Sequence, residues 1–333
     1  MGKVTWHTCK NGITKGLYTT WNLAKIIFPI TFVISILKYT PVIPALSSFL
    51  EPLMHFFGLT GDSALVLVLG NFLNLYAAVG AILTMDLTIK QVFILAVMLS
   101  LSHNMLVETA VITRIGVKPW ISAGIRLVMA FAAAKIIDVF WQGGQTMAQY
   151  GLVPSPSGIL TSWTEIVINA FQTALIGIAQ VAVMVTLVMI MIQILKDIHI
   201  LDIFSRLLRP FTNFLGLSES SAVTLLAGTI FGIAYGAGVI IQSAEEENLS
   251  KKDIYLISIF LCACHAVIED TLIFVPLGIN VLPLLILRLI LALFVTTLSA
   301  LIWRRLEGKT EGEQINRNQN KKQKRRKVKY NDV

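Results

Sequence analysis

The sequence predicts an all-α membrane protein that crosses the bilayer several times and is built from two related halves of inverted topology. Hydrophobic residues make up 55% of the 333 residues and charged residues 14%, whereas a soluble domain has about 25% charged residues. Apolar stretches of about 20 residues, the length that crosses a hydrocarbon core, recur along the chain. In addition, residues 46–141 and 204–303 align as two copies of one sequence.

The internal repeat is defined by residues of the same or similar type at matched positions. The matched pairs are Gly70 with Gly228, Gly80 with Gly238, His103 with His265, Glu108 with Asp270, Thr109 with Thr271, Gly116 with Gly278, Arg126 with Arg288 and Trp141 with Trp303. Duplicated membrane domains related by a pseudo-two-fold axis commonly build transporters, with the binding site where the repeats meet. The repeat therefore predicts both an architecture and the place of a site.

The positions of Lys and Arg predict that the second half is inverted. Basic residues in short loops stay on the cytoplasmic side of a membrane. Eight full spans would place six basic residues outside, namely Lys38, Arg114, Lys118, Lys196, Arg206 and Arg209. Three spans and one re-entrant hairpin per half leave only Lys38 and Lys90 outside. An odd number of spans per half inverts the second half and puts both termini in the cytoplasm.

The first half begins with a cytoplasmic or interfacial segment at residues 1–22, followed by the first repeat at 23–141. Residues 44–58 carry apolar side chains at helical spacing, as in a helix that lies in the membrane interface. The Gly-rich residues 63–85 are predicted to be a re-entrant helical hairpin, because Gly permits a turn and because broken backbone needs cover at membrane depth. Two ordinary spans packed through glycines are the alternative.

The second half follows an extracytoplasmic linker at residues 142–164, which contains no Lys or Arg. The second repeat at 165–303 has the same order, with an amphipathic stretch at 201–216 and a Gly-rich hairpin at 220–243. The tail at 304–333 holds eleven Lys or Arg against four Asp or Glu. We expect a disordered cytoplasmic tail that contacts anionic lipid and binds no nucleic acid, since it directly follows a membrane helix.

Ionisable residues within the predicted spans mark the candidate site, since such residues are costly in a membrane and usually face a protein-lined cavity. A histidine with a carboxylate can store a proton, because imidazole titrates near neutral pH. With amide groups, the same residues can hydrogen-bond a polar solute. Hydrogen bonds that only hold helices together are the alternative. The candidates on these spans are His103, Asn104, Glu108, His265, Glu269 and Asp270.

Two further interpretations concern residues near this group. Arg126 and Arg288 lie in the next span of each half, and we expect each to form an ion pair with the carboxylate of its own half, with substrate binding as the alternative. Cys262, His265 and Glu269 are spaced i, i+3 and i+7. On a continuous helix this spacing places a thiol, an imidazole and a carboxylate on one face, where they could bind a transition metal.

The order of amphipathic helix, Gly-rich hairpin and polar span, given twice, resembles the Gate, or nucleoside-recognition, domain family. The resemblance rests on residues 57–59, 70–80 and 103–116 and on their counterparts 215–217, 228–238 and 265–278. The family includes domains similar to those of concentrative nucleoside transporters, ferrous-iron transporters and spore-maturation proteins. It implies an elevator-like carrier that binds substrate near the broken spans and the hairpin tips, here Asn71, Asn74, Thr229 and Tyr235.

This sequence departs from that pattern in two ways. The hairpin tips lack the acidic residue of a nucleoside carrier, with Asn71 and Asn74 in its place, and the GTPase domain of the iron transporters is absent.

The expected function is that of a secondary transporter or gate subunit in a bacterial cytoplasmic membrane. It would move a small polar solute, with a nucleoside favoured, coupled to a proton or sodium ion. A divalent-metal permease and a non-transport membrane scaffold are the alternatives. No Walker A, HExxH or GxSxG motif is present, so neither enzymatic activity nor a cofactor is expected. Expected partners are membrane lipid, the solute or ion, and a second copy or another membrane subunit.

Overall fold

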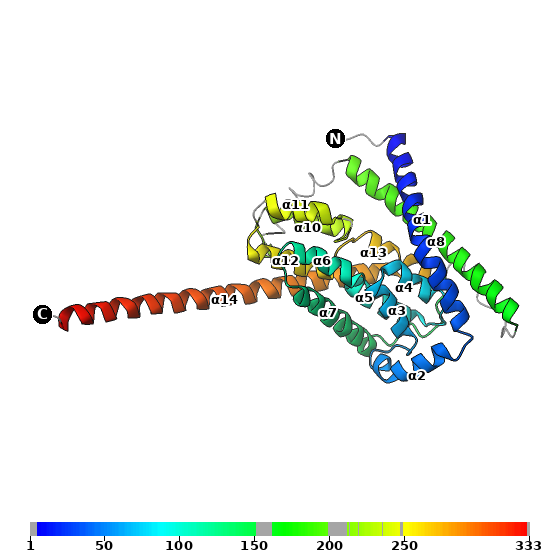
Figure 1. Ribbon diagram of the computed structural model, residues 1–333, viewed down its shortest axis with the longest axis horizontal. Helices are drawn as coiled ribbons and strands as arrows, with labels where there is room; N and C mark the ends of the chain where they lie inside the picture. The colour runs from blue at the N-terminus through cyan, green and yellow to red at the C-terminus, as the bar shows by residue number, and fades with distance from the viewer. Residues whose placement is uncertain are drawn as a thin grey trace.

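The computed structural model is an all-helical body from which one long helix extends (Figure 1). It describes residues 5–150, 162–198, 212, 214–218, 220–234, 236–246 and 249–331. Within these ranges there is no strand, only an isolated bridge between Thr88 and Met147. Much of the predicted linker, most of the second amphipathic stretch and Tyr235 lie outside the described residues.

The described helices follow the same order in the two halves, except that the counterpart of α2 lies outside the described residues. The first half contains α1 (Trp6–Leu37), α2 (Val42–His55), α3 (Ser63–Phe72), α4 (Leu75–Ile82), α5 (Ile89–Ser102), α6 (Met105–Arg114) and α7 (Pro119–Phe140). The second half contains α8 (Trp163–Asp197), α10 (Ser221–Phe231), α11 (Ala237–Glu246), α12 (Lys251–Ala263), α13 (Glu269–Leu272), the short η1 (Val275–Leu277) and α14 (Val281–Asn331).

Several helices have the length and composition of membrane spans. In the described part of the chain, Ile89–Arg114, Trp163–Met191 and Val281–Leu306 qualify, and α1 is a fourth when its two parts, bent by 42°, count as one. The sequence predicts six spans. The other two correspond to α7, which carries three charged residues, and to α12, which ends after 13 residues. Length and apolarity alone therefore do not identify α7 and α12 as membrane spans.

The Gly-rich segments each form two short helices that contact one another, α3 with α4 and α10 with α11. The α3 and α4 helices have 10 and 8 residues, and at about 1.5 Å per residue neither can cross a hydrocarbon core of about 30 Å. This shape is that of the helical hairpin that the glycines predict, whereas its entry into the membrane stays a prediction.

The α2 helix presents an apolar surface away from the body. Phe49 is 79% exposed and Leu53 57% exposed, whereas Met54 and Phe57 are buried against the core. Exposed aromatic and aliphatic side chains along one face are typical of a helix in the membrane interface. The structure is thus compatible with the predicted position of this helix.

The tail continues α14 as one helix to Asn331, where the composition predicts disorder. A helix that is already nucleated extends at little cost. The Lys, Arg, Gln and Glu residues that dominate the tail are also good helix formers. The prediction of disorder did not consider that the preceding membrane helix could continue into the tail.

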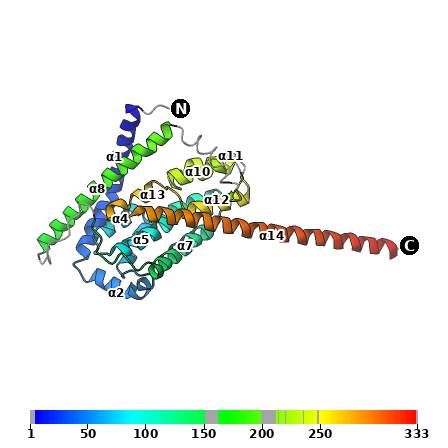
Figure 2. The same ribbon diagram turned by 180° about the vertical axis from the view of Figure 1, so that it is seen from behind.

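The α1 helix runs along α8 at one side of the body (Figures 1 and 2). Gly12 and Gly16 lie one turn apart on the contact face. A Cβ atom on Gly12 would lie 2.6 Å from Ile190 Cα, and one on Gly16 would lie 2.6 Å from Thr186 Cα. Small residues at this spacing let membrane helices approach closely.

Replacing Gly16 with isoleucine is expected to destabilise the protein by about 1–3 kcal/mol, the usual cost of overpacking a close contact. Gly124 in α7 provides the control, because a Cβ atom there meets nothing within 4 Å. Thermal unfolding of both variants in detergent measures the difference. Equal midpoints for Gly16→Ile and Gly124→Ile would contradict close packing of α1 on α8.

Candidate functional site

The two histidines lie where helices of both halves break. The first break separates α5 from α6 at His103 and Asn104, and the second separates α12 from α13 around His265 and Ala266. Asn104 has φ +50° and Ala266 has φ +42°, and within the described residues no other non-glycine residue has positive φ. Side chains with a Cβ disfavour this conformation, so the surrounding structure must hold it, as is common at functional sites.

The hairpins hold the two breaks through equivalent hydrogen bonds. The Asn104 amide donates to the carbonyl of Gly70 at 2.8 Å, and the Ala266 amide donates to the carbonyl of Gly228 at 3.2 Å. Gly70 and Gly228 are counterparts in the repeat, as are Asn104 and Ala266. A side chain at Gly70 would collide with Leu99 of α5, and one at Gly228 would collide with Leu261 of α12. The repeat in the sequence is therefore also a repeat of contacts.

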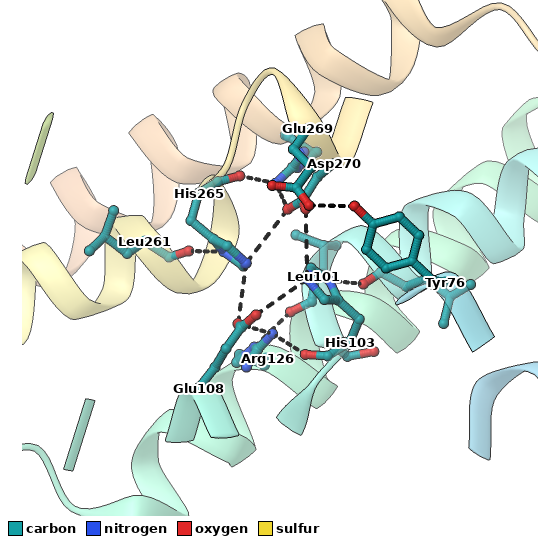
Figure 3. Close-up of polar contacts among 12 residues, drawn as sticks. Tyr76, Leu101, His103, Glu108, Arg126, Leu261, His265, Glu269 and Asp270 are labelled. Carbon is teal, nitrogen blue, oxygen red and sulfur yellow. Dashed lines mark hydrogen bonds and ion pairs between the residues drawn. The ribbon is translucent and has the colours of Figure 1, made fainter. Parts of the chain in front are cut away.

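Each half contributes an arginine, a carboxylate and a histidine to one buried cluster. Figure 3 labels the histidines, the carboxylates and the arginine of the first half. Arg126 Nη2 lies 2.7 Å from Glu108 Oε2, and Arg288 Nη2 lies 3.0 Å from Asp270 Oδ2. Each arginine thus contacts the carboxylate of its own half, as the sequence predicts.

The arginines also bind the backbone at the breaks. Arg126 Nη2 donates to the carbonyl of His103, and Arg288 Nη2 donates to that of His265, both at 2.6 Å. Arg126 Nε donates in addition to the carbonyl of Leu101 at 3.0 Å. These bonds satisfy carbonyl groups at the ends of α5 and α12, so one guanidinium both closes a helix end and neutralises a carboxylate.

The histidines connect the two halves. His103 Nε2 lies 3.3 Å from Glu108 Oε1 and 3.8 Å from Asp270 Oδ1. His265 Nε2 lies 3.2 Å from Glu108 Oε2 and 3.6 Å from Asp270 Oδ2. The centres of the two imidazole rings are 5.2 Å apart. Each histidine therefore faces a carboxylate from its own half and one from the other half.

The other ring nitrogen of each histidine, Nδ1, shows which nitrogen carries the hydrogen in the neutral ring. His103 Nδ1 lies 2.7 Å from the carbonyl oxygen of Leu99, and His265 Nδ1 lies 2.6 Å from that of Leu261. A carbonyl only accepts, so both Nδ1 atoms carry hydrogen. In a neutral ring Nε2 is then an acceptor, and its lone pair faces carboxylates. An added proton converts that unfavourable contact into a charge-assisted hydrogen bond.

A third carboxylate makes the cluster asymmetric. Tyr76 in α4 donates its hydroxyl to Glu269 Oε1 at 2.6 Å, across the two halves. The counterparts of Tyr76 and Glu269 in the repeat are Ala234 and Val107. In the part of the chain that the structure describes, Glu269 forms no ion pair with lysine or arginine. The position of Glu269 within a predicted span marks it as a candidate binding residue. The spacing of residues in the sequence does not reveal that its partner is a tyrosine of the other half.

A cavity of ≈ 320 Å³ adjoins the cluster and receives residues from both halves. This volume is near the lower end of the range of small-molecule sites, about 300–1,000 Å³. The predicted residues that line it are Asn74, His103, Asn104, Glu108, His265, Glu269 and Asp270. Tyr76 also lines the cavity, although no pattern in the sequence marks it as part of a site.

Four other predicted residues lie elsewhere. Asn71 Nδ2 donates to the carbonyl of Leu67 at 2.7 Å, and Thr229 Oγ1 donates to that of Leu225 at 2.7 Å, so both bind within their own helices. The arginines are fully buried behind the carboxylates and do not line the cavity.

The structure does not assemble the predicted metal ligands Cys262, His265 and Glu269. The helix ends at Ala263, before His265, so the expected common helix face is lost. Cys262 Sγ lies 3.6 Å from Ser122 Oγ. Within the described residues, the group with three potential ligand atoms within 4.8 Å of one another is His103, His265 and Asp270.

The charges around that group favour a proton over a divalent ion. Glu108 and Asp270 are each neutralised by a buried arginine. A divalent ion would add two positive charges to groups that are already paired, and uncompensated buried charge is costly.

Comparison with known proteins agrees with the repeat and with a membrane location. The Gate family model, described as nucleoside recognition, matches residues 20–119 and 178–280. The uncharacterized membrane protein YvoD of Bacillus subtilis (strain 168) is 43% identical over 303 residues, which cover 91% of this chain and 97% of that protein. No solved structure matches the chain. The matched segments contain both hairpins and both helix breaks.

Proposed function

This chain belongs to the Gate, or nucleoside-recognition, family, and on that premise we propose that it is a proton-coupled secondary transporter of a small polar solute. The observation that carries the proposal is the buried cluster in which each histidine faces carboxylates of both halves. The cluster lines a cavity of suitable size for a small solute. Two halves joined by titratable groups at a shared cavity are suited to alternating access.

Proton binding would change the attraction between the halves. With neutral rings, the Nε2 atoms face carboxylates of the opposite half through lone pairs. With a protonated ring, the same distances give charge-assisted hydrogen bonds that hold the halves together. A proton that binds one arrangement better than another shifts the equilibrium between them. The histidines thereby couple proton movement to the exposure of the cavity.

The orientation follows from the basic residues. We propose inverted halves, hairpins that enter from opposite faces, and both termini in the cytoplasm of a bacterial cell. The rule that basic residues stay cytoplasmic supports this arrangement. The short helices of each hairpin are consistent with re-entry.

A nucleoside is the first candidate solute. The cavity combines the amide groups of Asn74 and Asn104 with the apolar side chains of Leu75, Ile233 and Ile273. Amides can hydrogen-bond ribose hydroxyls or base edges, and aliphatic side chains can cover a flat ring. The Gate family description supports the same choice.

Uptake by purified protein in proteoliposomes tests the proposal. With the membrane potential clamped and the outside one pH unit more acidic, one proton per solute supports about tenfold accumulation of a neutral nucleoside, because one pH unit corresponds to about 1.36 kcal/mol. Radiolabelled uridine and adenosine serve as probes, with empty liposomes as the control. Uptake of neither nucleoside, or uptake that ignores the gradient, would contradict a proton-coupled nucleoside carrier. Uptake of Mn²⁺ or Fe²⁺ in their place would favour a metal permease.

A further inference from the structure

The cluster contains one carboxylate more than it contains arginines, and we propose that this excess charge, on Glu269, sets its occupancy at one proton held by the His103–His265 pair. The consequence for transport, one proton per cycle, rests on the proposed function. The occupancy itself is a property of the resting protein, and it can be measured without any solute.

The charge of the cluster follows from the contacts between its ionisable groups. Arg126 with Glu108 and Arg288 with Asp270 form two neutral pairs. Among the described residues, the buried carboxylate of Glu269 accepts one hydrogen bond, from the Tyr76 hydroxyl. With all three carboxyl groups ionised and both histidines neutral, the cluster carries one negative charge. One proton added to the histidines removes this charge, and a second gives the cluster one positive charge. Buried net charge is costly at membrane depth, so the singly protonated form is favoured.

Among the residues that the structure describes, no further group next to the histidines alters this count. The remaining titratable neighbours in these ranges are the buried thiols of Cys262 and Cys264 and the hydroxyl of Tyr76. Free thiols titrate near about 8.5 and phenols near about 10, so all three are neutral at pH 7. The charged groups that face the pair are therefore those of α6, α7, α13 and α14 already named.

The proton is held on the histidines because their geometry accepts it. A proton from water bonds to the lone pair of His103 Nε2 or His265 Nε2, and the new N–H donates to Glu108 or Asp270. Both carboxylates lie within 3.2–3.8 Å of both Nε2 atoms. The proton can therefore move from one ring to the other through a shared carboxylate. On release, the N–H bond breaks, the electron pair returns to Nε2, and the proton returns to water.

The repeat supplies a matched variant that adds a carboxylate outside the buried cluster. Val107 occupies the position of Glu269 in the first half and lines the cavity, but it is 50% exposed whereas Glu269 is buried. The carboxylate of Val107→Glu is therefore hydrated and needs no proton to compensate its charge. If the buried excess charge sets the occupancy, Glu269→Gln holds no proton on the histidine pair and Val107→Glu holds one, as the parent does.

Imidazole ¹⁵N NMR of the full-length protein in lipid nanodiscs at neutral pH measures the occupancy. The protein is labelled on histidine, and His7, His55 and His199 are replaced by glutamine so that only the pair is observed. One imidazolium per molecule is expected for the parent and for Val107→Glu, and none is expected for Glu269→Gln. The same imidazolium content in Glu269→Gln as in the parent would overturn the proposal, as would a fully neutral or doubly protonated pair in the parent.

The outcome separates this inference from the proposed function. One imidazolium that disappears in Glu269→Gln, without solute accumulation in any gradient, would leave the occupancy intact and refute the transporter. Accumulation driven by a pH gradient, with the imidazolium unchanged in Glu269→Gln, would support the transporter and refute the role of Glu269.

Discussion

Replacing Arg126 with leucine is expected to destabilise the protein by about 3–5 kcal/mol, because Glu108 would remain buried without its ion-pair partner. Arg126 has no exposed surface, and its Nη2 lies 2.7 Å from Glu108 Oε2. Its guanidinium also donates to the carbonyls of Leu101 and His103 at the end of α5. Thermal and denaturant unfolding of the purified variant measures the loss.

The double variant Glu108→Leu/Arg126→Leu separates the lost pair from the uncompensated charge. It is expected to recover part of the stability, since both charges are removed together and the coupling appears in the double-mutant cycle. Arg288→Leu is the matched change in the second half, where Arg288 is also fully buried. A loss below about 1 kcal/mol for either single variant, within the range of exposed ion pairs, would show that the arginines do not hold the breaks.

Replacing both histidines with alanine is expected to abolish accumulation driven by a pH gradient. A one-unit gradient supports about tenfold accumulation when one proton accompanies each solute, and the ratio should fall to one when the proton site is removed. Each single variant retains one ring between the same two carboxylates, so partial coupling should remain.

Counterflow exchange and an exposed histidine provide the controls for this experiment. Solute exchange without a gradient needs the cavity and not the driving force, so it should persist in the double variant if the protein folds. His55→Ala changes an exposed histidine in α2 and should leave accumulation unchanged. Accumulation that survives in His103→Ala/His265→Ala would place proton coupling outside this cluster.

The sequence predicted the main partners of the site because the repeat and the ion pairs are encoded by residue type. Matched residues in the two halves make matched contacts, as the Arg126–Glu108 and Arg288–Asp270 pairs show. A buried arginine needs a carboxylate, and each half offers one at the right depth. These two ion pairs could therefore be inferred from the sequence alone.

Contacts between the halves could not be inferred in this way. Tyr76 and Glu269 are 193 positions apart and meet only because the hairpin of one half reaches the break of the other. The prediction that Cys262, His265 and Glu269 share one helix face is wrong for a related reason. It assumed a continuous helix, whereas the backbone at Ala266 turns away to bond with Gly228. Long-range hydrogen bonds decide these positions, and local periodicity does not contain them.

Glu269 has Val107 as its counterpart in the first half, and this difference between the halves bears on how such a site can arise. A protein assembled from two identical single-repeat subunits carries every substitution twice, so unpaired carboxylates at its symmetry axis come in even numbers. A single chain with two diverged halves can carry an odd number. Joining the halves in one chain therefore allows an odd number of unpaired carboxylates, which a symmetric homodimer cannot have. The Tyr76–Glu269 contact lies where this chain departs from symmetry.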